Sequence, residues 1–173
     1  AGLTFTAGDG TADGVMTFSG AVADVNTALN GITVTPTANF NGSASVQVVV
    51  SDLGSTGSGW TLTDTETVAI TVNAVNDAPV ATVPGGQTTN EDVALTLNGV
   101  SVADVDAASL QVTLTGTNGV VTLSTLAGLT FTAGDGTADG VMTFTGTIAS
   151  LNTALSGMTV TPTANFNGSA SVQ

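Results

Sequence analysis

The sequence contains no Lys, Arg, His, Cys or Tyr. Its 173 residues include 13 Asp plus Glu, so the formal net charge is -13 with no side chain of opposite sign. Nucleic-acid affinity depends on Lys and Arg that neutralise phosphates, so the composition excludes DNA and RNA as partners. Basic segments also attract anionic lipid surfaces, and no run of about 18 apolar residues is present. We therefore expect no membrane insertion by this segment.

The missing side chains also restrict enzyme chemistry. Only Asp and Glu remain as proton-transfer groups, which leaves a paired-carboxylate glycosidase as the plausible enzyme. Glycosidase clefts stack sugars on aromatic rings, whereas this chain has one Trp and six Phe, most of them in strand patterns. No catalytic site is visible, so we expect no enzymatic activity. The absence of Cys removes disulfides and thiol chemistry.

The residues that are present favour an ordered β-protein. The chain is 42% hydrophobic and 8% charged, and Val, Ile and Thr are abundant, as in β-sheets. Apolar residues alternate with polar ones in many short segments that Gly, Asn and Asp separate. Examples are Val93 to Leu97, Val112 and Leu114, Leu129 and Phe131, Ala44 to Val50, and Val68 to Val72. This pattern predicts a β-sandwich with Greek-key connections.

Two segments depart from this alternation, because their apolar residues stand at i, i+3 and i+7 before a glycine. They are Val22, Val25 and Leu29 before Gly31, and Ile148, Leu151 and Leu155 before Gly157. Each predicts a short amphipathic helix with a glycine stop. We expect these helices to be a modest decoration on the sandwich.

An internal repeat sets the domain organisation. Residues 1–47 recur at 127–173 with seven differences, so the period is 126 residues. A unit of that size is a self-contained domain rather than a solenoid coil. Residues 72–79 form the expected linker, because Asn-Asp-Ala-Pro follows an alternating strand and Pro79 stiffens the chain. Residues 1–76 are then the C-terminal part of one module, and residues 77–173 the N-terminal part of the next.

The beginning and end of the chain lead to a further expectation. Ala1 is neither an initiator Met nor part of a signal peptide, which suggests a fragment of a longer polypeptide. Both ends fall inside a module of the repeat. We favour a segment cut from a continuous array over open modules that are completed by strand donation between chains.

Acidic residues gather around the expected linker. Asp77, Glu91, Asp104 and Asp106 lie within 30 residues of sequence, with Asn76 beside them and Asp52 in the preceding module. With no cation in the chain, these carboxylates must face water, protonate or share a metal ion. Calcium suits them best, since it takes six to eight oxygen ligands. In an extended strand, Asp104 and Asp106 would point to the same side.

A second acidic element, AGDGTADG, holds Asp9 and Asp13 in one copy and Asp135 and Asp139 in the other. It has neither EF-hand spacing nor tandem nonapeptides. We favour a hairpin or loop over a metal site here, because Asp-Gly commonly makes turns.

Several of these motifs together resemble a known family. VNDAP, NED, DVDA, TPTANFNG and VSD are similar to motifs of the cadherin-like tandem repeat modules of large bacterial surface adhesins of the RTX type. The resemblance implies tandem Ig- or cadherin-like β-sandwiches, an extracellular location at the bacterial cell surface, and calcium at module junctions. The implied ligands are Asp77, Glu91, Asp104 and Asp106, with Asn76 and Asp52 as further candidates. The linker departs from the cadherin pattern because no second Asp-Asn pair follows Asp77.

These observations predict a calcium-stiffened stalk or spacer repeat of an extracellular bacterial adhesin, whose partners are calcium ions and neighbouring modules of the same polypeptide. One alternative is a segment of a self-assembling extracellular filament or surface layer, which would bind other copies of itself. A second alternative is a carbohydrate-binding module that stacks a sugar on Trp60. A single Trp more often covers one end of a sandwich core.

Overall fold

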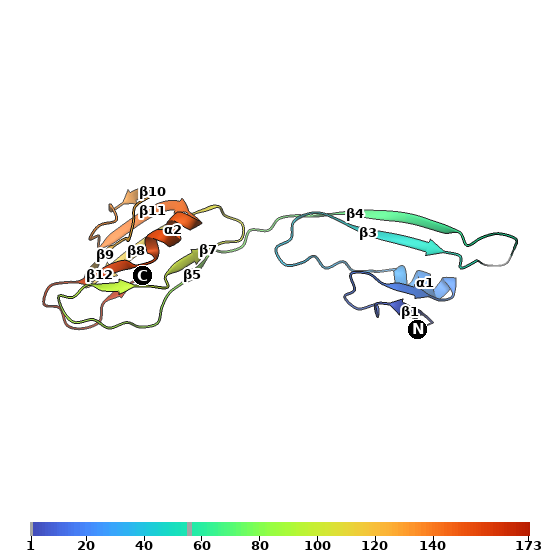
Figure 1. The fold of residues 1–173 in the computed structure, drawn as a ribbon, viewed down its shortest axis with the longest axis horizontal. Helices are drawn as coiled ribbons and strands as arrows, with labels where there is room; N and C mark the ends of the chain where they lie inside the picture. Colours follow the sequence, from blue (N-terminus) through green and yellow to red (C-terminus); the bar gives the residue numbers. More distant parts are fainter. Residues whose placement is uncertain (1, 55–56) are drawn as a thin grey trace. The chain divides into compact units, whose positions relative to one another are not determined.

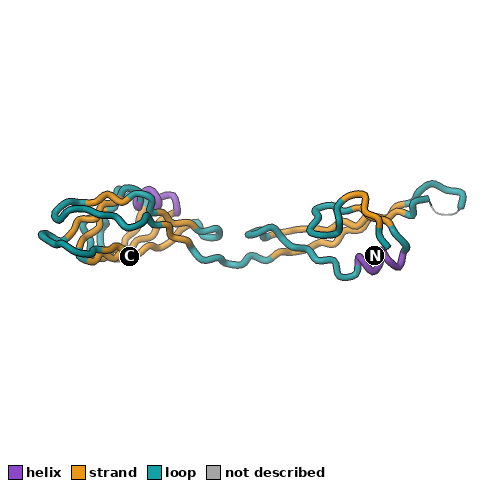
Figure 2. Tube along the Cα trace, turned by 90° about the horizontal axis from the view of Figure 1, so that it is seen from below, coloured by secondary structure: helices purple, strands orange, loops and turns teal. Residues whose placement is uncertain are grey.

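The computed structural model describes residues 2–54 and 57–173. The chain divides into two compact units, Ala1–Val75 and Asn76–Gln173. The strand pairings in the described ranges are all antiparallel, and the helical residues belong to two short helices (Figure 2). The fold is therefore all-β in character, as the alternating pattern predicts.

The second unit is the larger assembly of strands (Figure 1). Its elements are β5 (Val80–Thr82), β6 (Leu95–Leu97), β7 (Ser101–Ala103), β8 (Ser109–Thr117), β9 (Gly119–Thr122), β10 (Leu129–Ala133), β11 (Val141–Thr147), α2 (Ile148–Leu155), β12 (Met158–Pro162) and β13 (Ser171–Val172). They form a four-stranded sheet in the order β10-β11-β8-β13, a three-stranded sheet in the order β6-β12-β9, and the pair β5-β7.

The buried core lies in this second unit. Its apolar side chains come from both larger sheets and from α2, and Met142, Phe144 and Leu151 are fully buried. Phe131 and Phe144 also pack against each other as a tilted aromatic pair. Because an antiparallel strand alternates its faces, the outward positions of these strands remain available for Thr and Ser.

Helix α2 contributes more than decoration. It spans the residues that the i, i+3, i+7 spacing predicts, and Leu151, Ala154 and Leu155 are all buried. The Thr147 side chain caps its first turn by accepting a hydrogen bond from the Ser150 amide. The expectation of a modest decoration is wrong for this helix, because three of its eight residues are part of the core.

The first unit contains fewer elements. They are β1 (Thr4–Ala7), β2 (Thr17–Ser19), α1 (Val22–Leu29), β3 (Gly42–Ser51) and β4 (Thr63–Val72). Strands β1 and β2 pair, and β3 and β4 form a long hairpin in which Gly42 lies opposite Val72. The segment between β3 and β4 includes residues 55–56, which lie outside the described residues.

The two copies of the repeated sequence therefore differ in how deeply their counterpart side chains are buried. Met142 is fully buried, whereas its counterpart Met16 is 37% exposed. Val160 belongs to strand β12 between β6 and β9, whereas its counterpart Val34 lies outside any strand. Among residues 2–54 and 57–75, no strand corresponds to β6, β8 or β9. The first unit therefore lacks the strands that cover the core in the second.

Candidate functional site

The loop after β7 holds two of the predicted calcium ligands. Asp104 Oδ1 accepts hydrogen bonds from the amides of Asp106 (2.8 Å) and Ala107 (2.7 Å). Strand β7 ends at Ala103, so Asp104 and Asp106 do not lie in an extended strand as expected. A tight turn closed by the Asp104 carboxylate brings them together instead.

The end of the linker lies against this loop. The Asp77 amide donates a hydrogen bond to Asp106 Oδ2 at 2.6 Å, although the two residues are 29 positions apart in sequence. The Asn76 side chain donates to the Asp77 carbonyl at 3.0 Å. Asp77 and Asp106 are exposed, and Asp104 is half-buried. The structure thus brings these three residues to one place, with Asn76 beside them.

The chemistry of this group fits a hard cation. Its side chains offer carboxylate and amide oxygens, which calcium prefers. Asp104 Oδ2 and Asp106 Oδ1 accept no hydrogen bond from the described residues. Within residues 2–54 and 57–173, however, no three carboxylates converge closely enough to hold an ion on their own. Backbone carbonyls and water would have to complete a shell of six to eight oxygens.

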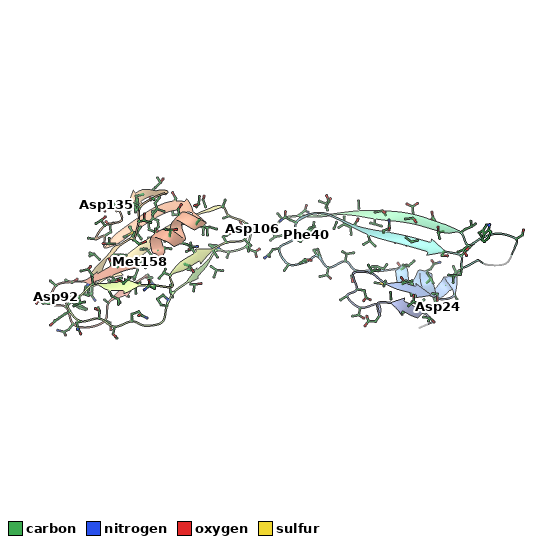
Figure 3. All side chains as sticks on the ribbon, viewed as in Figure 1. Asp24, Phe40, Asp92, Asp106, Asp135 and Met158 are labelled. Atoms are coloured by element: carbon green, nitrogen blue, oxygen red, sulfur yellow. The ribbon has the colours of Figure 1, made fainter. Side chains whose placement is uncertain are left out.

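Glu91 lies elsewhere in the same unit. It precedes Asp92, and Figure 3 shows Asp92 and Asp106 at opposite ends of this unit. Asp92 has a positive φ of 63°, and its Oδ1 accepts a hydrogen bond from the Asn165 amide at 2.8 Å. The structure therefore does not bring Glu91 to Asp104 and Asp106. No local signal in the sequence indicates the Asp92–Asn165 contact, because 73 residues separate the two.

Asp52 lies in the first unit, at the end of the hairpin opposite Val72. Its Oδ1 accepts hydrogen bonds from the amides of Gly54 and Leu62, both at 2.9 Å. These bonds hold the pKa of the Asp52 carboxyl below its usual value. Strand β4 alone spans ten residues between the hairpin loop and the linker, or roughly 30 Å at the usual rise per residue. Asp52 thus organises its own loop.

The AGDGTADG segments form the predicted turns. In the second unit, Asp139 Oδ2 accepts hydrogen bonds from the amides of Asp135 (3.0 Å) and Gly136 (2.7 Å). Asp135 Oδ1 in turn accepts one from Thr137 (2.9 Å). The segment joins β10 to β11 as a hairpin loop. Both carboxylates are therefore engaged in closing the turn.

Trp60 covers no core in the first unit. Its side chain is 92% exposed, at the hairpin end beyond β3 and before β4. The more common role for a single Trp, covering one end of a core, is wrong here. The alternative of a sugar stacked on Trp60 stays a prediction.

Comparison of the chain with protein-family models, with curated proteins and with solved structures finds no match. In the described ranges, no helix has the length and apolar character needed to cross a membrane.

Proposed function

We propose that this chain is a calcium-stiffened structural repeat, a stalk or spacer of an extracellular bacterial adhesin that mediates attachment to surfaces or within biofilms. One observation carries the proposal: the linker residue Asp77 is hydrogen-bonded to the carboxylate of Asp106, beside Asp104. A linker that contacts a cluster of oxygen ligands can be fixed by a cation shared between the two.

The proposed mechanism restrains the linker. Asp104 and Asp106 would supply carboxylate oxygens from the loop, and Asp77 would supply oxygens from the linker. A bound calcium ion contributes two positive charges, which offset the repulsion between these carboxylates in a chain without cationic side chains. Pro79 fixes its own φ and restricts the backbone of the preceding residue. Together these restraints would hold each module at a fixed angle to its own linker.

Glu91 fits the same scheme at the other end of the module. In the first unit Val72, the last residue of β4, pairs with Gly42, whose counterpart in the second unit is Gly168. The same register would place the exit of the following linker near the loop of residues 163–168, which Asp92 contacts through Asn165. We assign Glu91 to that following linker rather than to the one at Asp77.

The proposal includes a finer fold. Two antiparallel sheets that share one core support an Ig- or cadherin-like Greek-key sandwich, repeated along the polypeptide with a period of 126 residues. An array of near-identical domains suits a spacer, since neighbours interact only with neighbours.

The test compares the 173-residue chain with calcium and with a chelator. Calcium should raise the melting temperature of the second unit and reduce the spread of dimensions measured by small-angle X-ray scattering. Replacing Asp104→Asn together with Asp106→Asn should abolish both effects. Asn keeps one side-chain oxygen, so the turn that Asp104 closes can persist.

The matched control is Asp64→Asn together with Glu66→Gln on β4 of the first unit. It removes the same amount of negative charge from exposed positions away from the linker. This variant should keep the full calcium response. Equal melting temperatures and dimensions with calcium and with chelator in the unsubstituted chain would refute the proposal.

A further inference from the structure

The chain contains five Asn-Gly pairs, which begin at Asn30, Asn41, Asn98, Asn118 and Asn167. In such a pair the backbone nitrogen of the glycine can attack the side-chain carbonyl carbon of the asparagine, and ammonia leaves. The succinimide ring that forms takes up one water molecule and opens to aspartate or isoaspartate. Glycine favours ring closure because it has no Cβ and rotates freely. Each pair is therefore a chemical candidate for deamidation without an enzyme.

Asn98 and Asn118 allow a matched comparison within the second unit. Asn98 lies between β6 and β7, and Asn118 lies between β8 and β9. Both are followed by Gly-Val, so the residues after the reacting bond are the same. Both asparagines are also exposed, so access of water does not distinguish them. The difference between them lies in the hydrogen bonds of the fold.

The reacting atoms at Asn98 are unrestrained. Within residues 2–54 and 57–173, the Asn98 side chain makes no hydrogen bond and the Gly99 amide donates none. Gly99 has a φ of +81°, and the space where a Cβ would lie is open. An amide nitrogen without an acceptor can lose its proton, and a side chain without a partner can rotate towards it.

Asn118 is held on both its side chain and its backbone. Its Nδ2 donates a hydrogen bond to the Ser169 carbonyl at 3.0 Å. Its own carbonyl accepts one from the Thr163 amide at 2.9 Å. Gly119 is the first residue of β9 and pairs with Pro162 of β12. Ring closure at Asn118 would therefore break the bond to Ser169 and displace a backbone that is already paired.

We propose that Asn98 is a site of spontaneous deamidation in the folded protein, and that the fold protects Asn118 from the same reaction. The modification adds one negative charge to a chain that already carries -13. Where isoaspartate forms, one extra carbon enters the main chain directly after Leu97, whose carbonyl accepts a hydrogen bond from the Gly157 amide at 3.0 Å. The connection from β6 to β7 is lengthened next to the β6–β12 pairing.

The reaction consumes only water, so the experiments are done in chelator and succeed or fail independently of the calcium proposal. The folded 173-residue chain is incubated at mildly alkaline pH and then digested with pepsin. Trypsin would not cut a chain without Lys and Arg. Pepsin cuts beside leucine, and Leu110 and Leu114 separate Asn98 from Asn118. Mass spectrometry of the two peptides measures the conversion of amide to acid at each site.

We expect Asn98 to convert at least about tenfold faster than Asn118 in the folded chain, because the barrier at Asn118 includes the loss of a hydrogen bond. Water enriched in oxygen-18 should label the acid at position 98, since opening of the ring takes up solvent. Asn98→Gln should abolish conversion at this position, because the longer side chain closes a five-membered ring no more. It should leave the conversion of Asn118 unchanged.

Unfolding in urea supplies the internal control. Without the fold, Asn98 and Asn118 should convert at rates within about threefold of each other, since both precede Gly-Val. Asn118 should therefore accelerate about tenfold or more on unfolding, whereas Asn98 should change by less than about threefold.

Two results would overturn the proposal. Equal conversion of Asn98 and Asn118 in the folded chain would mean that the bonds to Ser169 and Thr163 do not protect Asn118. An acceleration of Asn98 on unfolding as large as that of Asn118 would mean that the β6–β7 connection restrains the reacting atoms in the folded protein.

Discussion

At the scale of single residues, the clearest feature is the turn AGDGTADG, which forms twice with the same hydrogen bonds. Asp13 Oδ2 accepts from the amides of Asp9 (2.9 Å) and Gly10 (2.7 Å), as its counterpart Asp139 does in the second unit. The two turns have different surroundings, since only the second pairs with β9 through Val121. The turn is therefore encoded by its own residues, which is why the sequence predicts it correctly.

Gly134 should be indispensable to this turn. Its φ is +70°, and a Cβ there would lie 2.8 Å from the Asp139 carboxylate carbon. We expect Gly134→Ala to lower the free energy of unfolding of the second unit by about 2 kcal/mol, from backbone strain and steric overlap. Gly140→Ala is the control, because that site is open and has no positive φ. It should change stability by less than about 0.5 kcal/mol in urea unfolding. Equal effects would contradict this account of the turn.

At the scale of elements, α2 is fixed to β7 by one side chain. The Asn152 amide group donates to the Val102 carbonyl at 3.0 Å and accepts from the Val102 amide at 2.7 Å. Val102 lies in β7, whose other side pairs with β5. The Asn152 side chain therefore takes the place of a neighbouring strand. It satisfies the amide and carbonyl of Val102, which would otherwise need the backbone of another strand as partner.

Removing this contact should cost stability only in the second unit. We expect Asn152→Ala to lower its free energy of unfolding by about 2 kcal/mol, because two partly buried backbone groups lose their partner. Asn26→Ala is the internal control. Asn26 is the identical residue of α1, yet it is exposed and its side chain makes no hydrogen bond within the described residues. Thermal unfolding should show a change below about 0.5 kcal/mol for the control. Similar losses of unfolding free energy in both variants would contradict this role of the Asn152 side chain.

Helix α2 also shows which features can be predicted from the sequence and which cannot. Both helices begin and end where the spacing of Val22, Leu29, Ile148 and Leu155 places them, because helical periodicity is local. The Asn152–Val102 contact could not be predicted, since it joins residues 50 positions apart through the topology of the sheets.

For the candidate site too, the sequence predicts some of the residues that lie together and not others. Sequence proximity and motif placed Asp104 and Asp106 beside the linker residue Asp77, and the structure brings these three together. Glu91 and Asp52 were grouped with them only by sequence distance and resemblance. The direction of the intervening strands decides where these two residues lie, and no pattern within a short window contains that information.

At the scale of the whole molecule, the 47-residue repeat does not carry its own core. Phe144 is fully buried, while its counterpart Phe18 is only half-buried. Met158 is 2% exposed, while its counterpart Ile32 is 46% exposed. What differs is the presence of β6, β8 and β9 around the second copy. Cooperative burial thus belongs to the 126-residue module rather than to the repeated segment, as expected for a sandwich with non-local strand pairing.

This difference predicts unequal stability of the two units. At low protein concentration we expect the first unit to unfold at a lower temperature, which calorimetry should show as the earlier of two transitions. Met142→Ala should lower the free energy of unfolding of the second unit by about 3 kcal/mol, because it leaves a cavity in a closed core. Calorimetry should show the later transition shifting while the earlier transition stays in place.

Met16→Ala is the matched exchange at the equivalent, 37% exposed position. Its effect should stay below about 1 kcal/mol and should appear only in the earlier transition, because little apolar surface is removed from contact. Equal losses from Met16→Ala and Met142→Ala would mean that the first unit buries Met16 in solution as fully as the second buries Met142. In that case burial would follow from the repeated residues alone, and the strands β6, β8 and β9 would not be what closes the core.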